Sequence, residues 1–404
     1  MLPLDDLLVL DLTRVLSGPY GSMQLGDFGA RVIKIERPGE GDDTRAFGPP
    51  FLRGESVYFL SINRNKESLA VDLKKAEGQA LVRELAARAD VLLENFRPGA
   101  LERLGLSYAA LREVNPRLVY TSLSGFGHAG APEWVARPGY DLVVQGMSGL
   151  ASLTGEPEQP PLRCGVAIAD LVAGLYGVIG TLVALHARER TGRGQHVDVS
   201  MLDGQISLLT YYAGNFFATG ETPVRMGNRH PSIVPYGTFR SRDGYFNLAC
   251  GTDAMWRALA GEVLGRTDLA SDPRFATNAG RVERRNELLQ EVEQILATQP
   301  SAWWLARLEA AGIPCGPIYT VAEALGHPQV QARDMVVGLK HATAGDLQVT
   351  GVPVRLSETP GSVRTPPPRL GEHTRQVLGE LLGKTGKELD ELARRGVISG
   401  AGDC

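Results

Sequence analysis

The sequence has few cysteines, few aromatic residues and no excess of either charge. Its four cysteines, Cys164, Cys250, Cys315 and Cys404, are far apart and form no Cys-x-x-Cys pair. We therefore expect a reducing compartment and no structural zinc, and since no histidine has metal spacing with another ligand, we expect no metal site. The aromatic content is 6% and the formal net charge is −4. A basic field for nucleic acid is absent, and we expect no nucleic-acid partner.

The sequence also shows no recognisable targeting signal. The start, MLPLDDLLVLDL, has no positive segment and is interrupted by Asp5 and Asp6, so it does not resemble a secretory signal. Residues 165–187 approach the length of a membrane span but contain Asp170 and four glycines. We interpret this stretch as a buried helix. The expectation is a cytoplasmic protein without a membrane partner.

What is present is an alternation of short apolar runs with helical patterns. The predicted strands are 7–12, 30–36, 68–73, 90–95, 117–123 and 195–201, and predicted helices cover 17–27, 76–88 and a stretch beginning at Pro98. This alternation predicts an α/β fold with a parallel, doubly wound sheet. Ligands of such sheets bind beyond the carboxyl ends of the strands.

The alternation of strand and helix patterns ends near residue 221. Residues 221–329 carry Gly- and Pro-rich turns, strands near 236–239 and 245–249, and helices near 253–264, 281–297 and 301–311. We predict a smaller α+β domain there. Residues 330–404 add a short β region at 347–356 and closing helices from His373 and Lys387. The expected division is 1–220, 221–329 and 330–404, with 404 residues sufficient for two domains.

The most apolar segment, residues 163–188, is predicted to be one long helix. Large residues recur at helical spacing at Leu171, Leu175, Val178, Leu182 and Leu185, and small residues form a second stripe at Ala173, Gly177, Gly180 and Ala184. We expect this helix to be buried on every face, with another backbone against the small stripe.

A single carboxylate, Asp170, stands near the start of this helix. It fits an N-cap that satisfies the first free amides. It also fits a nucleophile that the helix dipole keeps ionised. The two roles are compatible, and this stretch alone does not separate them.

Other motifs admit two interpretations each. GFGHAG, with Gly125, Gly127 and Gly130, matches a dinucleotide fingerprint, but Pro132 and Pro138 break the helix that should follow, so we interpret it as a loop. Basic residues near strand ends would suit a phosphate-rich ligand or be ordinary surface charge; they are Arg37, Lys74, Lys75, Arg97 and Arg103.

Several segments in fixed order point to a family. They are LDLTRVLSGPYGSMQLGDFGARVIKIERPGEGD, NRNKESLAVDL, ENFRPGALERLG, SGFGHAG, PGYDLVVQGMSGL, GQHVDVSMLDGQ, GNRHPSIVPYG and LGEHT. Together they resemble the class III CoA-transferases, the family of formyl-CoA and carnitine CoA-transferases that also contains 2-methylacyl-CoA racemases. The resemblance runs from residue 7 to about residue 398.

The resemblance implies a Rossmann-like large domain built from both chain ends, a smaller domain between them, and a homodimer of two interlocked chains. Close packing of interwound chains would give the small-residue stripe a use. It further implies that Asp170 is the nucleophile, which attacks an acyl-CoA thioester and passes through an aspartyl anhydride and an enzyme-CoA thioester. Coenzyme A is then a substrate together with a small carboxylic acid, and no tightly bound cofactor is expected.

The family's CoA contacts map onto ten positions. They are Val15, Leu16, Ser17, Arg37, Val71, Lys74, Asn95, Phe96, Arg103 and Tyr140. By this resemblance Phe96 offers a face to the adenine, and Arg37 or Arg103 meets phosphate.

Two other functions stay open. Racemases of the superfamily have a histidine at the position of Tyr140. Tyrosine has an ordinary pKa of about 10 and is therefore a poor base at neutral pH. A non-catalytic CoA-binding subunit would keep the CoA loops without needing Asp170. The sequence has both the CoA-binding loops and Asp170, which favours a CoA-transferase.

The acceptor acid is suggested only indirectly. The glycine-rich loop of formyl-CoA:oxalate enzymes would fall near 249–256, where this chain has Gly251 alone. That departure argues against oxalate. The sequence looks more like relatives that use succinyl-CoA and short dicarboxylic or hydroxy acids, with Arg229 or His230 as candidate partners of a distal carboxylate. Each of these two residues also fits a purely structural role.

Overall fold

The computed structural model describes residues 1–400, so Cys404 lies outside the described residues. The chain divides into two compact units. Unit 1 comprises residues 1–150, 163–214 and 328–404, and unit 2 comprises 151–162 and 215–327. The short segment 151–162 therefore belongs with the smaller unit, although it precedes the long apolar helix in sequence.

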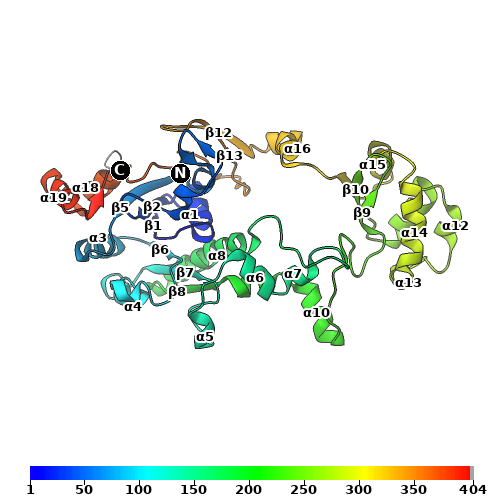
Figure 1. Ribbon diagram of the computed structural model, residues 1–404, viewed down its shortest axis with the longest axis horizontal. Helices are drawn as coiled ribbons and strands as arrows, with labels where there is room; N and C mark the ends of the chain where they lie inside the picture. The colour runs from blue at the N-terminus through cyan, green and yellow to red at the C-terminus, as the bar shows by residue number, and fades with distance from the viewer. Residues whose placement is uncertain (401–404) are drawn as a thin grey trace. The chain divides into compact units, whose positions relative to one another are not determined.

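Unit 1 is built on a seven-stranded sheet with the order β14-β5-β2-β1-β6-β7-β8 (Figure 1). The strands are β1 (Leu8–Asp11), β2 (Arg31–Glu36), β5 (Lys66–Val71), β6 (Val91–Glu94), β7 (Val119–Ser124), β8 (His196–Ser200) and β14 (Ile398–Ser399). All pairings are parallel except that of β14 with β5. The predicted α/β class with a parallel sheet is confirmed.

Helices cover both faces of this sheet because successive strand residues point to opposite sides. Val9, for example, packs in the cluster of α1 and α8, whereas Leu10 packs in the cluster of α3, α4 and α18. The helices of unit 1 include α1 (Ser17–Asp27), α2 (Val57–Ile62), α3 (Ala76–Ala86), α4 (Tyr108–Val114), α5 (Pro132–Val135), α6 (Asp141–Met147), α8 (Ile168–Thr191), α9 (Met201–Ser207), α18 (Thr374–Leu382) and α19 (Gly386–Arg394).

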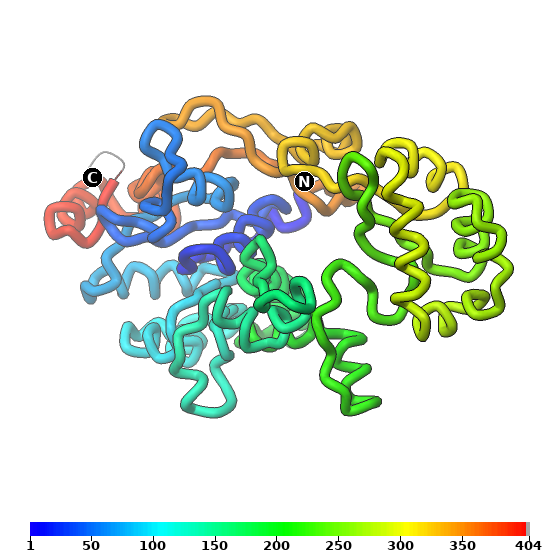
Figure 2. Tube along the Cα trace, turned by 45° about the vertical axis from the view of Figure 1, so that its right-hand side comes forward, coloured from blue at the N-terminus to red at the C-terminus, as the bar shows by residue number. Residues whose placement is uncertain are grey.

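The C-terminal segment completes the edge of the sheet. β14 pairs with β5 through Ile398 and Val71, and Figure 2 shows the C-terminal segment, in red, next to the blue N-terminal part of the chain. Two small hairpins flank the sheet, β3 (Phe51–Leu52) with β4 (Glu55–Ser56) and β12 (Val336–His341) with β13 (Gly345–Thr350). The two-residue β14 was not predicted because so short a strand carries no alternating pattern.

The helix predicted to begin at Pro98 does not form. Its place is taken by a turn and a short 3-10 helix, Glu102–Leu104, before α4 begins at Tyr108. Gly99 and Gly105 bracket this segment with φ values of 82° and 67°. Backbone in that left-handed region interrupts a right-handed helix, and glycine adopts it at little cost.

The small residues of α8 pack within their own chain. A Cβ on Gly21 of α1 would lie 3.0 Å from the carbonyl oxygen of Gly174, and a side chain on Gly174 would overlap the carbonyl oxygen of Ser17. Further along the helix, Gly177 faces Leu123 of β7 and Gly180 faces Val197 of β8. The close backbone contact is thus made by Gly174, which is not one of the four predicted stripe residues, whereas the stripe's Gly177 and Gly180 meet side chains of the sheet instead of a second backbone.

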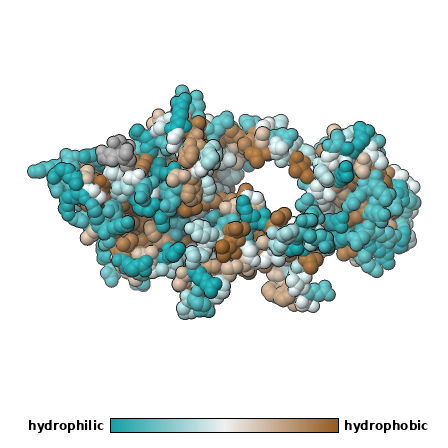
Figure 3. Space-filling view, in the orientation of Figure 1, coloured by the Kyte–Doolittle hydropathy of each residue, from teal (hydrophilic) through white to brown (hydrophobic). Residues whose placement is uncertain are grey.

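The expectation that α8 is buried on every face is wrong for the single chain. One face exposes the large apolar side chains Leu175, Tyr176, Ile179, Leu182 and Val183. Among residues 1–400, α8 is the one helix long and apolar enough to cross a membrane, a test that core helices also pass. Further apolar side chains are exposed on α6, at Leu142, Val143 and Met147, and Figure 3 shows apolar surface there.

Unit 2 contains a three-stranded sheet with the order β11-β10-β9 and its own core. Its strands are β9 (Tyr236–Arg240), β10 (Tyr245–Ala249) and β11 (Cys315–Pro317); its helices include α11 (Asp253–Ala258), α12 (Thr267–Ser271), α13 (Asn278–Glu283), α14 (Arg285–Leu296), α15 (Ser301–Ala310) and α16 (Val321–Gly326). Two short helices, α7 (Leu150–Leu153) and α10 (Thr210–Thr219), cross the unit boundaries, and α17 (Pro328–Ala332) opens the last segment of unit 1. The predicted helix 253–264 changes to a π-helix at Leu259–Val263.

The crossing of α1 and α8 gives a stability prediction. Gly174→Ala would place a methyl group against the Ser17 carbonyl, and overpacking of this kind costs about 1–3 kcal/mol, more than the gain of about 1 kcal/mol from alanine in a helix. Urea unfolding should show a lower free energy of unfolding. The matched control is Gly379→Ala in α18, where the nearest atom is 3.8 Å away. That variant should be neutral or stabilised, and equal effects at both positions would contradict the close crossing.

Candidate active site

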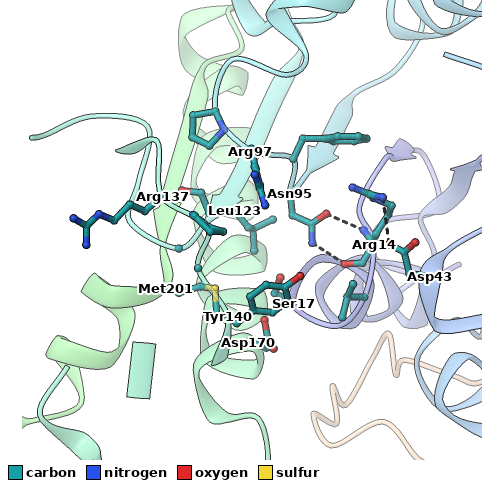
Figure 4. A pocket seen from close by; sticks show the side chains of 17 residues that line it. Arg14, Ser17, Asp43, Asn95, Arg97, Leu123, Arg137, Tyr140, Asp170 and Met201 are labelled. Atoms are coloured by element: carbon teal, nitrogen blue, oxygen red, sulfur yellow. Dashed lines mark hydrogen bonds and ion pairs between the residues drawn. The ribbon is translucent and has the colours of Figure 1, made fainter. Parts of the chain in front are cut away.

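The loops that follow the parallel strands enclose a cavity of about 200 Å³ in unit 1. The chain runs outward from β1 through β2 and β5 on one side and from β6 through β7 and β8 on the other. The order of strands therefore reverses between β1 and β6, which is where doubly wound sheets bind ligands. The cavity is lined from both sides of this point, by Arg14, Val15, Ser17, Asp43, Asn95, Phe96, Arg97, Pro98, Leu123, Ser124, Gly125, Arg137, Pro138, Gly139, Tyr140, Asp170 and Met201 (Figure 4).

Asn95 joins the two sides of the switch point. Its Oδ1 accepts the Arg14 amide at 2.8 Å, and its Nδ2 donates to the Arg14 carbonyl at 2.7 Å (Figure 4). Asn95 follows β6 and Arg14 follows β1, so these two bonds fix the loops to each other. The turn that leads into α1 is thereby held at the wall of the cavity.

Asp170 lies in the first turn of α8 and lines this cavity. Its carboxylate does not cap the helix. The amide of Ala169 donates instead to Oδ1 of Asp141, at 2.9 Å, from the first turn of α6. Oδ2 of Asp141 accepts from Gln145 at 2.8 Å. The N-cap interpretation of Asp170 is therefore wrong, and Asp141 performs that function while leaving the Asp170 carboxylate to the cavity.

The charge state of Asp170 also differs from expectation. Burial, with a smaller contribution from the neighbouring Asp141 carboxylate, raises the pKa of Asp170 to about 7. Desolvation disfavours the charged form of a carboxyl group, because burial removes the water that solvates the charge. An acid fully ionised at neutral pH, as the sequence suggested, is thus not found. Near pH 7 the group is divided between its two protonation states.

Most of the predicted CoA contacts lie in two cavities of unit 1. The first cavity contains Val15, Ser17, Asn95, Phe96 and Tyr140 together with Asp170. A second, of about 170 Å³, is mainly apolar and contains Arg37, Val71, Lys74 and Phe96. Arg14 and Phe96 line both cavities, so the two share a wall.

Two predicted contacts line neither cavity, and one is already paired. Leu16 is the N-cap residue of α1, and Arg103 is exposed in the 3-10 turn. Arg37 forms ion pairs with Asp43 at 2.7 Å and with Glu40 at 3.1 Å. The arginines that line the first cavity are Arg14, Arg97 and Arg137. The Arg14 guanidinium is paired with Asp43 at 3.2 Å, and that of Arg137 lies over the ring of Trp134.

The two candidate acceptor contacts belong to unit 2, whereas Asp170 belongs to unit 1. Arg229 forms an ion pair with Glu293 at 3.4 Å and lines a separate cavity of unit 2. The His230 ring packs against Tyr236, and its carbonyl accepts from Arg285 at 2.7 Å. Burial and the Arg285 charge lower the pKa of His230. Each residue thus has structural contacts of its own.

Sequence reasoning missed Arg14, Arg137 and Asp141. Arg14 follows a predicted strand as closely as the basic residues that were noted, so the same signal could have identified it. Asp141 is adjacent to Tyr140 in PGYD, but nothing in the sequence indicates that it reaches the amide of Ala169, 28 residues away. Within residues 1–400, no group of three His, Cys, Asp or Glu side chains is placed to hold a metal ion.

Comparison with known proteins agrees with this arrangement. The family described as CoA-transferase family III matches residues 4–374. Acetyl-CoA:oxalate CoA-transferase of Acetobacter aceti is 45% identical over 88% of this chain and 89% of its own. Succinate–glutarate CoA-transferase of Agrobacterium fabrum is 43% identical over 94% and 96%, respectively.

A solved structure supports the same fold. The crystal structure of a CAIB/BAIF family protein from Brucella suis superposes with a TM-score of 0.83 at 43% identity, covering 94% of this chain and 99% of that one. The resemblance found in the sequence is confirmed by these matches along nearly the whole chain. The protein is an enzyme that belongs to the family III CoA-transferases.

Proposed function

We propose that this enzyme moves CoA from succinyl-CoA, or a similar short acyl-CoA, to a dicarboxylic acid through a covalent intermediate on Asp170. One observation carries the proposal: Asp170 shares a cavity at the switch point of the sheet with five residues that family resemblance assigns to CoA. The relatives named above act on acetyl-CoA with oxalate and on succinate with glutarate.

The chemistry needs a carboxylate and no proton transfer. An Asp170 oxygen attacks the thioester carbonyl, the carbon–sulfur bond breaks, and CoA leaves as a thiolate. The thiolate attacks the aspartyl carbonyl of the anhydride, which releases the donor acid and leaves CoA on Asp170. The acceptor carboxylate then repeats the two steps in reverse. A carboxylate suits this sequence because it serves as nucleophile and, once acylated, as a leaving group.

The two adjoining cavities support a position for CoA. The apolar cavity beside Phe96, Val71 and Lys74 suits the adenine end. The guanidinium groups of Arg14 and Arg97 suit phosphates, because arginine pairs with phosphate oxygens in two bonds. The thioester then lies toward Asp170, where amides of the turn at Leu16 and Ser17 stabilise the developing oxyanion. CoA is a substrate in this proposal and not a resident cofactor.

The proposed assembly is a homodimer. The exposed face of α8 carries Leu175, Ile179, Leu182 and Val183 side by side, and α6 adds further exposed apolar side chains. Monomeric soluble proteins seldom expose so large a contiguous apolar patch. A second copy of the chain is the occupant that the family resemblance suggests, and interlocking of the two chains is part of this proposal.

Substrate exchange is the first test. With purified enzyme, [¹³C]glutarate, malate, citramalate and mesaconate are offered with succinyl-CoA, and oxalate with acetyl-CoA, beside monocarboxylate controls. Mass spectrometry should detect transfer to dicarboxylic acids and an acyl or CoA adduct on Asp170. Asp170→Ala should lose at least about 10³-fold in rate and form no adduct.

Three outcomes would count against this proposal. Exchange only with monocarboxylates would exclude the acceptor class, and retained exchange in Asp170→Ala would remove the nucleophile. Deuterium incorporation at the α-carbon of a 2-methylacyl-CoA without exchange between acids would select a racemase. Asp203→Ala, on α9 and outside the cavity lining, is the control variant and should keep its activity.

The pKa of Asp170 predicts the pH dependence. Its value of about 7 lies above the ordinary 3.8, so the reactive carboxylate is lost as pH falls through 7 and kcat/KM should fall with it. Asp141→Asn keeps an oxygen for the Ala169 amide but removes a like charge. The acid limb of the profile should move to lower pH. Glu113→Gln, at the surface of α4, should not move it.

The same titration has a consequence for stability. Between pH 3.8 and 7 the folded state binds more protons at Asp170 than the unfolded state does, so this group's contribution to stability decreases as pH rises through that window. Asp170→Asn should therefore raise the melting temperature more at pH 8 than at pH 4.5. An equal effect at both pH values would contradict the raised pKa, whereas an unmoved acid limb in Asp141→Asn would contradict the contribution of Asp141 to it.

The dimer is tested through the exposed face of α8. Ile179→Glu places a charge at its centre and should convert a species of twice the chain mass into monomers, measured by light scattering after size exclusion. Val114→Glu adds the same charge at an isolated exposed valine of α4 and should leave the mass unchanged. A monomeric wild type, or an unchanged mass in Ile179→Glu, would contradict the proposed interface.

A further inference from the structure

The turn beside Asp170 contains a strained residue. Val15 has φ of 68° and lines the cavity that holds Asp170. A β-branched residue in this left-handed region is an outlier, because its side chain crowds the neighbouring carbonyl. Such conformations persist only where surrounding contacts hold them. The contacts that hold Val15 in this conformation come from two neighbouring loops.

The peptide group between Arg14 and Val15 is bonded at both of its polar atoms. Its carbonyl accepts from Nδ2 of Asn95 at 2.7 Å, and its amide, on Val15, donates to Oδ1 of Asp42 at 3.2 Å. Rotation of this peptide would change the φ angle of Val15, and both bonds oppose that rotation. Two side chains on different loops therefore fix the strained torsion.

Asp42 is itself held by a buried ion pair. Its Oδ2 lies 2.8 Å from Nζ of Lys34, and both side chains are fully buried. Nζ of Lys34 also donates to the carbonyl of Thr13 at 2.9 Å. Oδ1 of Asp42 accepts from the amide and hydroxyl of Thr44 at 2.9 and 2.8 Å. The pair thus holds the turn at Thr13 and at Val15, two residues apart.

A buried ion pair adds little to the free energy of unfolding, because the cost of removing two charges from water is about as large as their mutual attraction. It does supply directional bonds that an apolar pair cannot. We infer that Lys34 and Asp42 are positioning residues that hold Val15 in its left-handed conformation, so that the cavity wall formed by Val15 and Ser17 keeps its place beside Asp170. For its activity readout, this inference rests on the proposed transfer reaction.

Glycine at position 15 separates positioning from ordinary structural support. Gly adopts a positive φ without the penalty that alanine keeps, while both remove the valine methyl groups. We therefore compare Val15→Gly with Val15→Ala in the wild-type background and together with Asp42→Ala. Where Asp42→Ala prevents folding, Lys34→Met/Asp42→Leu, which removes both charges, replaces it.

Loss of Asp42 should lower kcat about ten-fold or more, as expected for a displaced cavity wall. Adding Val15→Gly should restore kcat several-fold, and adding Val15→Ala should not. In urea unfolding, the advantage of glycine over alanine at position 15 should be larger in the wild-type background, where the strained conformation is enforced. This second readout requires no transferase activity, so it distinguishes failure of the inference from failure of the proposed function.

The control is the Arg64–Asp27 pair, which is similarly buried and has a distance of 2.7 Å. Within residues 1–400, neither of its side chains bonds to residues 13–17. Asp27→Ala should lower stability, but the difference between glycine and alanine at position 15 should equal that of the wild type. The inference would be overturned if the unfolding advantage of glycine over alanine at position 15 were the same in the wild-type and Asp42→Ala backgrounds, and if glycine restored kcat no better than alanine in the Asp42→Ala background.

Discussion

Two helices of unit 1 cross so closely that a side chain on Gly174 would overlap the other helix and one on Gly21 would be tightly packed. Gly21 of α1 lies against the carbonyl of Gly174 in α8, and Gly174 lies against that of Ser17. Asp170 stands one turn before Gly174, and the turn that contains Val15 leads directly into α1. The crossing therefore sets the separation between the carboxylate and the opposite wall of its cavity. With any larger residue at the contact, both elements would move apart.

The sheet beneath this crossing carries charges where parallel sheets are normally apolar. Asp11, Lys34 and Lys66 are fully buried. Burial opposes ionisation of Asp11, but Lys66 and Lys34 outweigh it and lower the pKa of Asp11 to about 2. Burial lowers the pKa of Lys66 to about 8 although Asp11 opposes this shift. Asp11 and Lys34 both bond to Thr13, so these charges serve the loop at the end of β1.

Sequence reasoning succeeded where the signal is local. Six strands of the seven-stranded sheet and α1 were predicted to within about two residues of their ends, because the apolar runs match these strands and Pro19 stands at the start of the helix. It failed on α8, because an apolar helix looks the same whether the chain itself or another molecule covers it. It also failed on the cap, because Asp141 reaches Ala169 only through the fold. Family resemblance pointed to Asp170, which lines the cavity, but its raised pKa depends on burial and on Asp141, which no local pattern records.

The raised pKa of Asp170 can be understood as part of the proposed chemistry. Burial penalises the carboxylate because it is charged, and protonation relieves the penalty. Acylation also removes the charge, so a neutral anhydride or thioester on Asp170 is relieved in the same way. Desolvation then favours the covalent intermediate relative to the free carboxylate, and Asp141 adds to this preference through repulsion of the free charge. The raised pKa is a disadvantage at low pH, where a proton and the acyl group compete for the same oxygen of Asp170.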